Sequence, residues 1–128
     1  MPADVVSSFI ASIERRDLDH ALSHLTDDCE YDNVPMGKVI GRDAVRTTLE
    51  PFLAQCTEVA WPVSHQVHSG NLDSGVVMNE RVDRFKVGAS WIALPVAGLF
   101  IIRHGQIALW RDYFDRESFT SQIAAALS

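Results

Sequence analysis

Polar side chains that could carry out acid–base chemistry recur at alternate positions in three β-rich stretches of the sequence. They are Tyr31 and Asn33 in "EYDNV", Arg81 and Asp83 in "NERVDRF", and Asp112 in "WRDYFD". Because side chains alternate along a strand, residues two apart share one face of a sheet. Two carboxyl groups held in different protonation states supply an acid and a base at once, so these residues indicate a proton-transfer site.

Arg81 would set the protonation state of such a site if it lay between the two aspartates. Two ionised carboxylates and one guanidinium leave an excess negative charge, which an apolar pocket disfavours. Retaining one proton makes Arg81, Asp83 and Asp112 neutral together, and the two carboxyls then titrate as a coupled pair. This charge count is symmetric, and it does not say which aspartate holds the proton.

Each of these signals also has an ordinary structural explanation. An Arg next to an Asp is usually a solvated surface pair, and Tyr31 and Asn33 fit the turn that ends a strand. The surface explanation is weaker for Asp112, since its face of the strand also carries Trp110 and Phe114. Both faces of that last strand are apolar, so hydrophobicity alone leaves its inward face undecided.

The length and composition of the chain indicate a single domain, residues 1–128, with a sizeable core. A net charge of −6 without a run of Lys or Arg argues against a nucleic-acid partner. Two cysteines are too few for a disulfide framework. The N-terminus lacks the basic start of a signal peptide, and no apolar stretch approaches the roughly 18 residues that span a bilayer. We therefore expect a soluble, cytoplasmic protein with no membrane partner.

Helical patterns dominate the first part of the chain, and long strands dominate the second. Apolar spacing and turn residues predict helices at 3–16, 18–25, 41–56 and 116–127, and strands at 29–34, 58–70, 75–87, 89–103 and 106–114. Pro51 is expected to kink or divide the third helix. This order predicts an α+β fold in which a strongly curved, mixed β-sheet bends into a cone, with the N-terminal helices packed over one face. The inside of the cone would form a pocket lined by alternate residues.

Strand alternation separates the charges in "WRDYFD". Asp112 points to one face of the strand, whereas Arg111 points to the other. The other residues on the Arg111 face are Ile107, Leu109 and Tyr113. We expect a helix layer or a second subunit to cover that outer face. Asp115 follows the strand and is expected to cap the final helix.

The combination of "YDN", "RVD" and "WRDYFD" resembles the limonene-1,2-epoxide hydrolase family. That family belongs to the cone-shaped α+β fold of the nuclear-transport-factor-2-like (NTF2-like) and ketosteroid-isomerase-like proteins. The resemblance runs over most of the chain and includes "GRDAV" and the hairpin "LPVAGLF…GQIALWRDYFD". "GRDAV" and "WRDYFD" recur widely in the fold, whereas Tyr-x-Asn with Arg-x-Asp and the Asp of "WRDYFD" is much more specific.

The resemblance implies hydrolysis of an epoxide in one step, without a covalent enzyme intermediate. Asp112 matches the base of the family, Asp83 its acid and Arg81 its arginine. Tyr31 and Asn33 match the residues that position the attacking water. The base deprotonates water as it attacks carbon, while the acid protonates the ring oxygen as it leaves.

Apolar residues on the same strands as the aspartates and on the neighbouring strand are candidates for walls that hold the substrate and exclude bulk water. The candidates are Phe85, Leu94, Val96 and Phe114. Phe85 and Phe114 each lie two residues beyond a candidate aspartate, on the same face. An ordinary hydrophobic core explains these residues equally well.

We expect no cofactor and no metal. His20 and His24 have helical i, i+4 spacing, but a third ligand is not evident. The sequence contains no Gly-rich phosphate loop and no GxSxG nucleophile motif. The expected partners are therefore a small apolar epoxide, water and a second copy of the chain in a homodimer.

Two other functions remain alternatives. One is an isomerase or polyketide-cyclase-type enzyme of the same cone, in which an Asp moves a proton next to a carbonyl. The other is a non-catalytic domain that binds a small ligand, which the fold also supports. The sequence does not indicate which epoxide is the natural substrate or which of its carbons is attacked.

Overall fold

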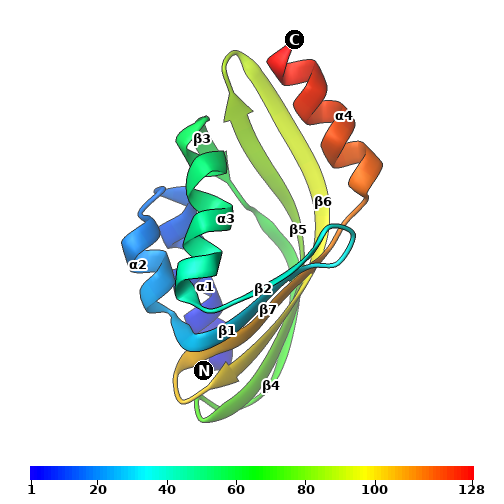
Figure 1. The fold of residues 1–128 in the computed structure, drawn as a ribbon. Coiled ribbons are helices and arrows are strands. Elements are labelled where there is room, and N and C mark those ends of the chain that lie inside the picture. The colour runs from blue at the N-terminus through cyan, green and yellow to red at the C-terminus, as the bar shows by residue number, and fades with distance from the viewer.

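A computed structural model describes residues 1–128, and it contains four helices and one strongly curled sheet (Figure 1). The helices are α1 (Pro2–Glu14), α2 (Leu18–Ser23), α3 (Arg42–Ala54) and α4 (Arg116–Leu127). The strands are β1 (Leu25–Asn33), β2 (Gly37–Ile40), β3 (Cys56–Ala60), β4 (Val63–Gly70), β5 (Ser74–Val87), β6 (Ser90–Arg103) and β7 (Gln106–Tyr113). This α+β architecture confirms the predicted fold class.

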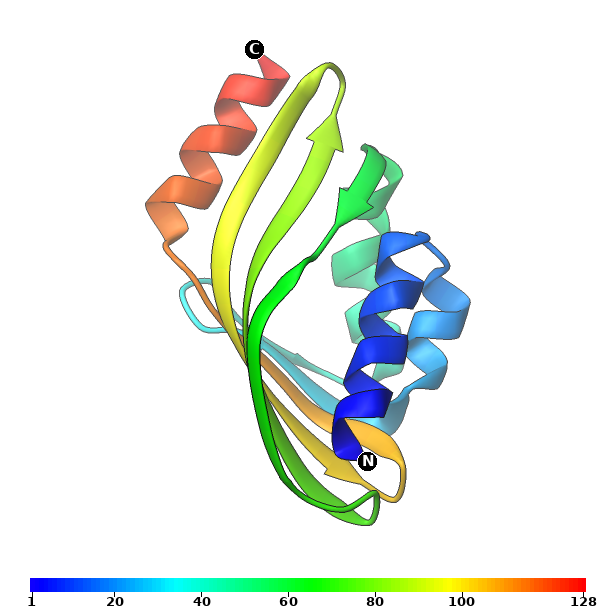
Figure 2. The same ribbon diagram turned by 180° about the vertical axis from the view of Figure 1, so that it is seen from behind.

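The sheet has seven strands in the order β2-β1-β7-β6-β5-β3, and β4 also pairs with β5. Only β1 and β7 run parallel; every other pair is antiparallel, so the sheet is mixed as expected. The sheet curls without closing into a barrel, and α1, α2 and α3 lie within the curl (Figure 2). None of the four helices is long and apolar enough to cross a membrane.

The core lies between the three N-terminal helices and the concave face of the sheet. α1 presents Val6, Phe9, Ile10 and Ile13 to it, and α3 presents Val45, Leu49 and Leu53. α4 lies apart from these helices along β6 and has no fully buried residue (Figure 1). Asp115 accepts a hydrogen bond from the backbone N–H of Glu117 at 3.1 Å, which confirms the predicted cap of α4.

Of the two expectations for Pro51, division of the helix is wrong, because α3 continues through Pro51 to Ala54. A second prediction near the middle of the chain is also wrong. The strand predicted at 58–70 is two strands, β3 and β4, which pair with different parts of β5. They are separated at Trp61 and Pro62, and proline has no N–H to donate to a ladder.

A bulge in β7 overturns a third prediction. Leu109 pairs with Ile101 of β6, but Ile107 pairs with the next residue, Ile102, so Ala108 is an extra residue. Ile107 consequently faces the core and is fully buried, instead of facing outward. Tyr113 does face outward and is exposed.

Arg111 lies on the outer face, as expected, but it does not contact the helix layer. Its Nε donates to Asp32 at 2.9 Å and its Nη2 to Glu30 at 3.0 Å, both on the neighbouring strand β1. The arginine of "WRDYFD" therefore pairs locally and takes no part in the interior of the cone.

Candidate active site

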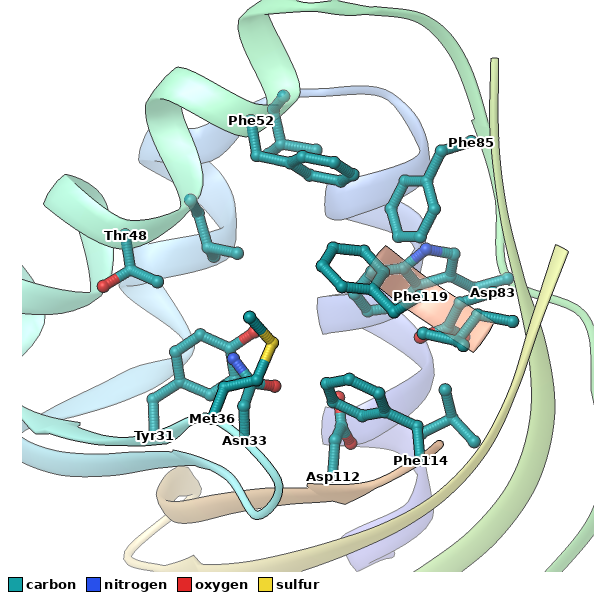
Figure 3. A pocket seen from close by; sticks show the side chains of 15 residues that line it. Tyr31, Asn33, Met36, Thr48, Phe52, Asp83, Phe85, Asp112, Phe114 and Phe119 are labelled. Carbon is teal, nitrogen blue, oxygen red and sulfur yellow. The ribbon is translucent and has the colours of Figure 1, made fainter. Parts of the chain in front are cut away.

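The concave face of the sheet and α3 enclose a cavity of about 190 Å³ (Figure 3). Fifteen residues line it and 11 of them are hydrophobic. All four predicted wall residues, Phe85, Leu94, Val96 and Phe114, are among them. Strand alternation therefore placed them on the correct face.

Arg81 is the centre of a buried polar cluster in the wall of this cavity, with 1% of its surface exposed. Its Nε and Nη2 donate to the two carboxylate oxygens of Asp83 at 2.8 and 2.9 Å. The same Nη2 donates to Asp112 at 3.0 Å, and Nη1 donates to the Asn79 side chain at 3.0 Å. Both aspartates are buried, so the surface-pair explanation of Arg81 and Asp83 is wrong.

A glycine in β6 allows this cluster to form across three strands. Gly98 pairs with Asn79 of β5 on one side and with Asp112 of β7 on the other. A Cβ at this position would overlap Nη1 of Arg81 and lie 2.9 Å from the Asn79 oxygen and 3.1 Å from an oxygen of Asp112. Only a residue without a side chain lets the guanidinium cross β6 to reach β7.

The parallel pairing of β1 with β7 brings the predicted water-positioning residues to the same place. Tyr31 pairs with Trp110, and Asn33 pairs with Asp112. The Tyr31 ring stacks on Trp110 with centroids 3.9 Å apart. Figure 3 shows Tyr31, Asn33 and Asp112 pointing from the strands into the cavity. Four of the five predicted polar residues thus line one pocket, and the fifth, Arg81, is joined to it through Asp83 and Asp112.

The sequence of residues 1–125 matches the family model described as the limonene-1,2-epoxide hydrolase catalytic domain. The chain belongs to this family. It is 31% identical over 110 residues to epoxide hydrolase EphG of Mycobacterium tuberculosis, covering 86% of this chain and 70% of that protein. The family suggested by the polar residues is therefore confirmed.

Solved structures agree with this family and with the fold. The structure of an M. tuberculosis epoxide hydrolase described as similar to limonene-1,2-epoxide hydrolase has a TM-score of 0.81 and 25% identity, and the match covers 98% of this chain and 91% of that one. A protein of the NTF2-like family from Streptomyces avermitilis has a TM-score of 0.79 at 12% identity, covering 88% of this chain and 92% of that one. The second likeness shows the fold alone, and it confirms the NTF2-like architecture.

Burial raises the pKa of both aspartates in this epoxide hydrolase family member. It raises the pKa of Asp112 to about 6, against the effect of Arg81 and with a contribution from the charge of Asp83. Burial likewise raises the pKa of Asp83; Arg81 lowers this pKa, and the charge of Glu14 raises it. Burial disfavours the charge of Arg81, but the two aspartates more than compensate and keep its pKa above the usual value. Arg81 therefore remains charged, and the carboxyl pair retains a proton more readily than free aspartates do.

The hydrogen bonds indicate which of the two aspartates holds that proton when no substrate is bound. Arg81 donates two hydrogen bonds to Asp83 and one to Asp112. Hydrogen bonds to a carboxylate stabilise its charged form, so charge is favoured on Asp83 and the proton on Asp112. The resemblance assigns the acid to Asp83, and that assignment therefore concerns a reacting state with substrate bound.

Asp112 has a second oxygen that is free to act on a ligand. Its Oδ2 accepts from Arg81, whereas the buried Oδ1 has no hydrogen-bond partner in the protein. Buried polar atoms are nearly always paired, so an unpaired carboxyl oxygen beside a cavity is a candidate hydrogen-bond partner for a molecule in the cavity.

Several residues of the site were not identified from the sequence. Asn79 is in phase with Arg81 and could have been found from the same alternation. Trp61 places its ring 5.1 Å from the guanidinium carbon of Arg81, but the break between β3 and β4 disrupts its strand phase. Phe52 and Phe119 line the cavity from α3 and α4, where strand alternation carries no information.

Proposed function

We propose that the protein is an epoxide hydrolase that adds water to an epoxide in one step to give a vicinal diol. The observation that carries this proposal is the contact of Arg81 with two buried carboxyls at the wall of an otherwise apolar cavity. Tyr31 and Asn33 lie beside one of those carboxyls, where a water could be held. Acid, base and water-positioning groups are what a concerted hydrolysis requires.

Asp112 acts as the base. A water that donates to its free Oδ1 is oriented by Tyr31 and Asn33, so that an oxygen lone pair faces the epoxide carbon. Asp112 takes a proton from this water as the oxygen attacks, and the new C–O bond forms as the C–O bond of the ring breaks. Such a positioned base contributes on the order of 10²–10⁴ in rate.

Asp83 acts as the acid and gives its proton to the ring oxygen as it leaves. An epoxide oxygen that accepts a hydrogen bond from Asp83 stabilises the protonated form of this residue. Water that donates to Asp112 stabilises the carboxylate there. Substrate and water together therefore reverse the proton distribution that the protein alone favours, and they prepare the acid and the base for reaction.

Arg81 compensates the charge throughout the reaction. Negative charge moves from Asp112 to Asp83 as the two protons transfer, and Nη2 of Arg81 contacts both carboxyls. No unpaired buried charge arises at any stage, which avoids a large electrostatic cost. The reaction ends with Asp83 charged and Asp112 protonated, the state that the hydrogen bonds of the protein favour.

The walls suit a small apolar substrate. A cavity of about 190 Å³ lined largely by hydrophobic side chains holds a compact carbon skeleton and excludes bulk water. An isomerase or cyclase that uses one Asp beside a carbonyl needs neither Arg81 between two carboxyls nor a pair of water-positioning residues. A binding domain needs no proton-sharing pair, so hydrolysis accounts for more of the site.

We also propose that two copies of the chain pair through the outer face of the sheet. The outward side chains of β5, β6 and β7 form a largely apolar patch there, with Arg111 between Leu109 and Tyr113; its apolar members are Val76, Met78, Leu99, Ile101, Leu109 and Tyr113. Met78 is 46% exposed and Tyr113 is 45% exposed. Monomers rarely leave such a surface in water, and a twofold dimer would cover it with the same patch of a second copy.

A panel of cyclic and acyclic epoxides, with chiral analysis of the diols, tests the hydrolase proposal and identifies the preferred substrate. The wild-type protein should form diol from at least one apolar epoxide, and Asp112→Asn should abolish turnover while the protein stays folded. No diol from a broad panel would favour a binding domain. Near wild-type activity in Asp112→Asn would remove Asp112 from the role of base.

A further inference from the structure

α1 ends in a carboxylate that supports the wall of the pocket. Glu14 accepts a hydrogen bond from the backbone N–H of Trp61 at 2.8 Å, across 47 residues of sequence. Trp61 stands between β3 and β4, where the pairing with β5 is interrupted: the last pair of β3 is Ala60 with Arg84, and the first of β4 is Val63 with Arg81. Trp61 is only 4% exposed, so without Glu14 its N–H would be buried and unpaired.

Trp61, whose backbone N–H binds Glu14, also packs its aromatic ring against Arg81. The guanidinium carbon of Arg81 lies 5.1 Å from the centroid of a Trp61 ring, within the range of a cation–π interaction. The indole also packs edge-on against Phe85 with centroids 5.9 Å apart, and it lines the cavity. Fixing the backbone of Trp61 therefore fixes one contact of the charged centre and one surface of the pocket.

The charge of Glu14 is not neutralised by an ion pair. The adjacent cations are engaged elsewhere: Arg15 lies 3.3 Å from a ring nitrogen of His20, and Arg16 donates to the backbone oxygen of Cys56 at 2.8 Å. Glu14 accordingly forms no salt bridge with either of them. Its negative charge remains available to act on the interior of the cone.

Asp83 is the group on which this charge acts. Arg81 contacts it from the same strand, Asp112 of β7 shares that arginine, and the charges of Tyr31 on β1 and Glu14 on α1 are coupled to it. β6 and α3 contribute no charged side chain to the cavity. Burial is the main cause of the raised pKa of Asp83, and Glu14 raises it further.

We propose that Glu14 is a positioning residue of this site, which fixes Trp61 against Arg81 and whose charge helps to retain the proton of the aspartate pair. The inference rests on the proposed hydrolase function and deepens it. Glu14 touches neither substrate nor reacting atoms; it acts through Trp61 and Asp83.

Two substitutions separate the hydrogen bond from the charge. Glu14→Gln keeps an oxygen that accepts from the Trp61 N–H but removes the charge, whereas Glu14→Ala removes both. Asp4→Asn is the matched control, because it removes the same charge from an exposed position of the same helix. The readouts are the pH profile of kcat/KM and, without substrate, the titration of ¹³C-labelled aspartate carboxyls by NMR.

In Glu14→Gln the acid must lose its proton at lower pH, because a negative charge that raised its pKa is gone. The alkaline limb of kcat/KM and the pKa of Asp83 should both fall by up to about 1 pH unit, the lower end of the effect of a neighbouring charge. Glu14→Ala should show the same shift and also lose between about tenfold and 100-fold in kcat/KM at every pH, as a displaced active-site wall does. Asp4→Asn should match the wild type.

Unchanged profiles and carboxyl titrations in Glu14→Gln would overturn the electrostatic role. Wild-type kcat/KM in a folded Glu14→Ala would overturn the positioning role. Should Glu14→Ala not fold, Glu14→Gln still decides the electrostatic role. A folded Trp61→Leu variant, which has no ring against Arg81, would then overturn the positioning role if its kcat/KM were unaltered. Should the wild type hydrolyse no epoxide, the NMR titration still decides: a lowered Asp83 pKa in Glu14→Gln supports the electrostatic role of Glu14, and an unchanged one overturns it.

Discussion

Arg81 on β5 reaches Asp112 on β7 across the intervening strand β6, with 3.0 Å between Nη2 and the carboxylate oxygen. Residues on strands that are not neighbours in a sheet are usually too far apart for such a contact. Gly98 makes it possible, because β6 carries no side chain at the point of crossing. The charged centre of the site therefore depends on a residue that takes no part in the chemistry.

Gly98→Ala should inactivate the protein without unfolding it. The added methyl group overlaps Nη1 of Arg81, so the guanidinium must move away from Asp112. A displacement of this kind costs on the order of 100-fold in rate, and overpacking costs about 1–3 kcal/mol of stability. Diol formation and thermal unfolding measure the two effects. Ala97→Ser, whose side chain faces the other side of β6, is the control, and a fully active Gly98→Ala would contradict the geometry.

Stability should fall as pH rises through the pKa of Asp112. The folded-state pKa of about 6 lies above the ordinary value of 3.8, so this group stabilises the fold most below pH 4 and the contribution is lost as pH approaches and passes 6. The loss is on the order of 3 kcal/mol. Urea unfolding between pH 4 and 7 should show a steeper decline in the wild type than in Asp112→Asn, in which only Asp83 of the pair remains to titrate. Parallel curves for the two proteins would contradict it.

The alternation of side chains along a strand predicted the inward-facing residues correctly where the strands are regular. It placed Asp83, Phe85 and Phe114 on the inner face, because β5 and the end of β7 keep a strict two-residue period. It failed for Ile107, because the bulge at Ala108 shifts the inward–outward alternation of side chains along β7 by one residue. No residue type in this stretch indicates a bulge. It also failed at Trp61, where one predicted strand is two.

Contacts between elements that are far apart in the sequence could not be predicted from local sequence patterns. Glu14 and Trp61 are 47 residues apart, and nothing in the local sequence of either one predicts their hydrogen bond. The sequence gives no sign that Gly98 is special, because its role depends on side chains from the two neighbouring strands. The family resemblance assigned roles to the polar residues of the site, whereas the contacts that Gly98 and Glu14 make around them became visible only in the structure.

Tyr31→Phe should slow hydrolysis without destabilising the fold. The phenyl ring keeps the stacking on Trp110 and loses only the hydroxyl to which we assign the positioning of water. Removing one such hydrogen-bonding group costs about 10²–10³ in kcat. Tyr113→Phe, at the only other tyrosine, is the matched control and should keep its activity. Equal kcat values for the two variants would exclude Tyr31 from water positioning.

Met78→Glu should prevent dimer formation. It introduces a charge within the apolar patch on the outer sheet face, where a second copy would bury it. Light scattering coupled to size exclusion should give the mass of two chains for the wild type and of one for the variant. Leu127→Glu, at an exposed apolar position on α4 outside the patch, should stay dimeric. A wild type that is monomeric at all concentrations would contradict the proposed interface.

The origin of the diol oxygen tests the central claim most directly. The wild-type protein, in excess over a hydrolysable epoxide, is allowed a single turnover in ¹⁸O-water, and the diol is analysed by mass spectrometry. Direct attack by water held at Asp112, Tyr31 and Asn33 predicts one ¹⁸O in every diol molecule. Diol without label in that first turnover would mean that the oxygen came from an enzyme carboxylate through a covalent intermediate, and it would contradict one-step hydrolysis.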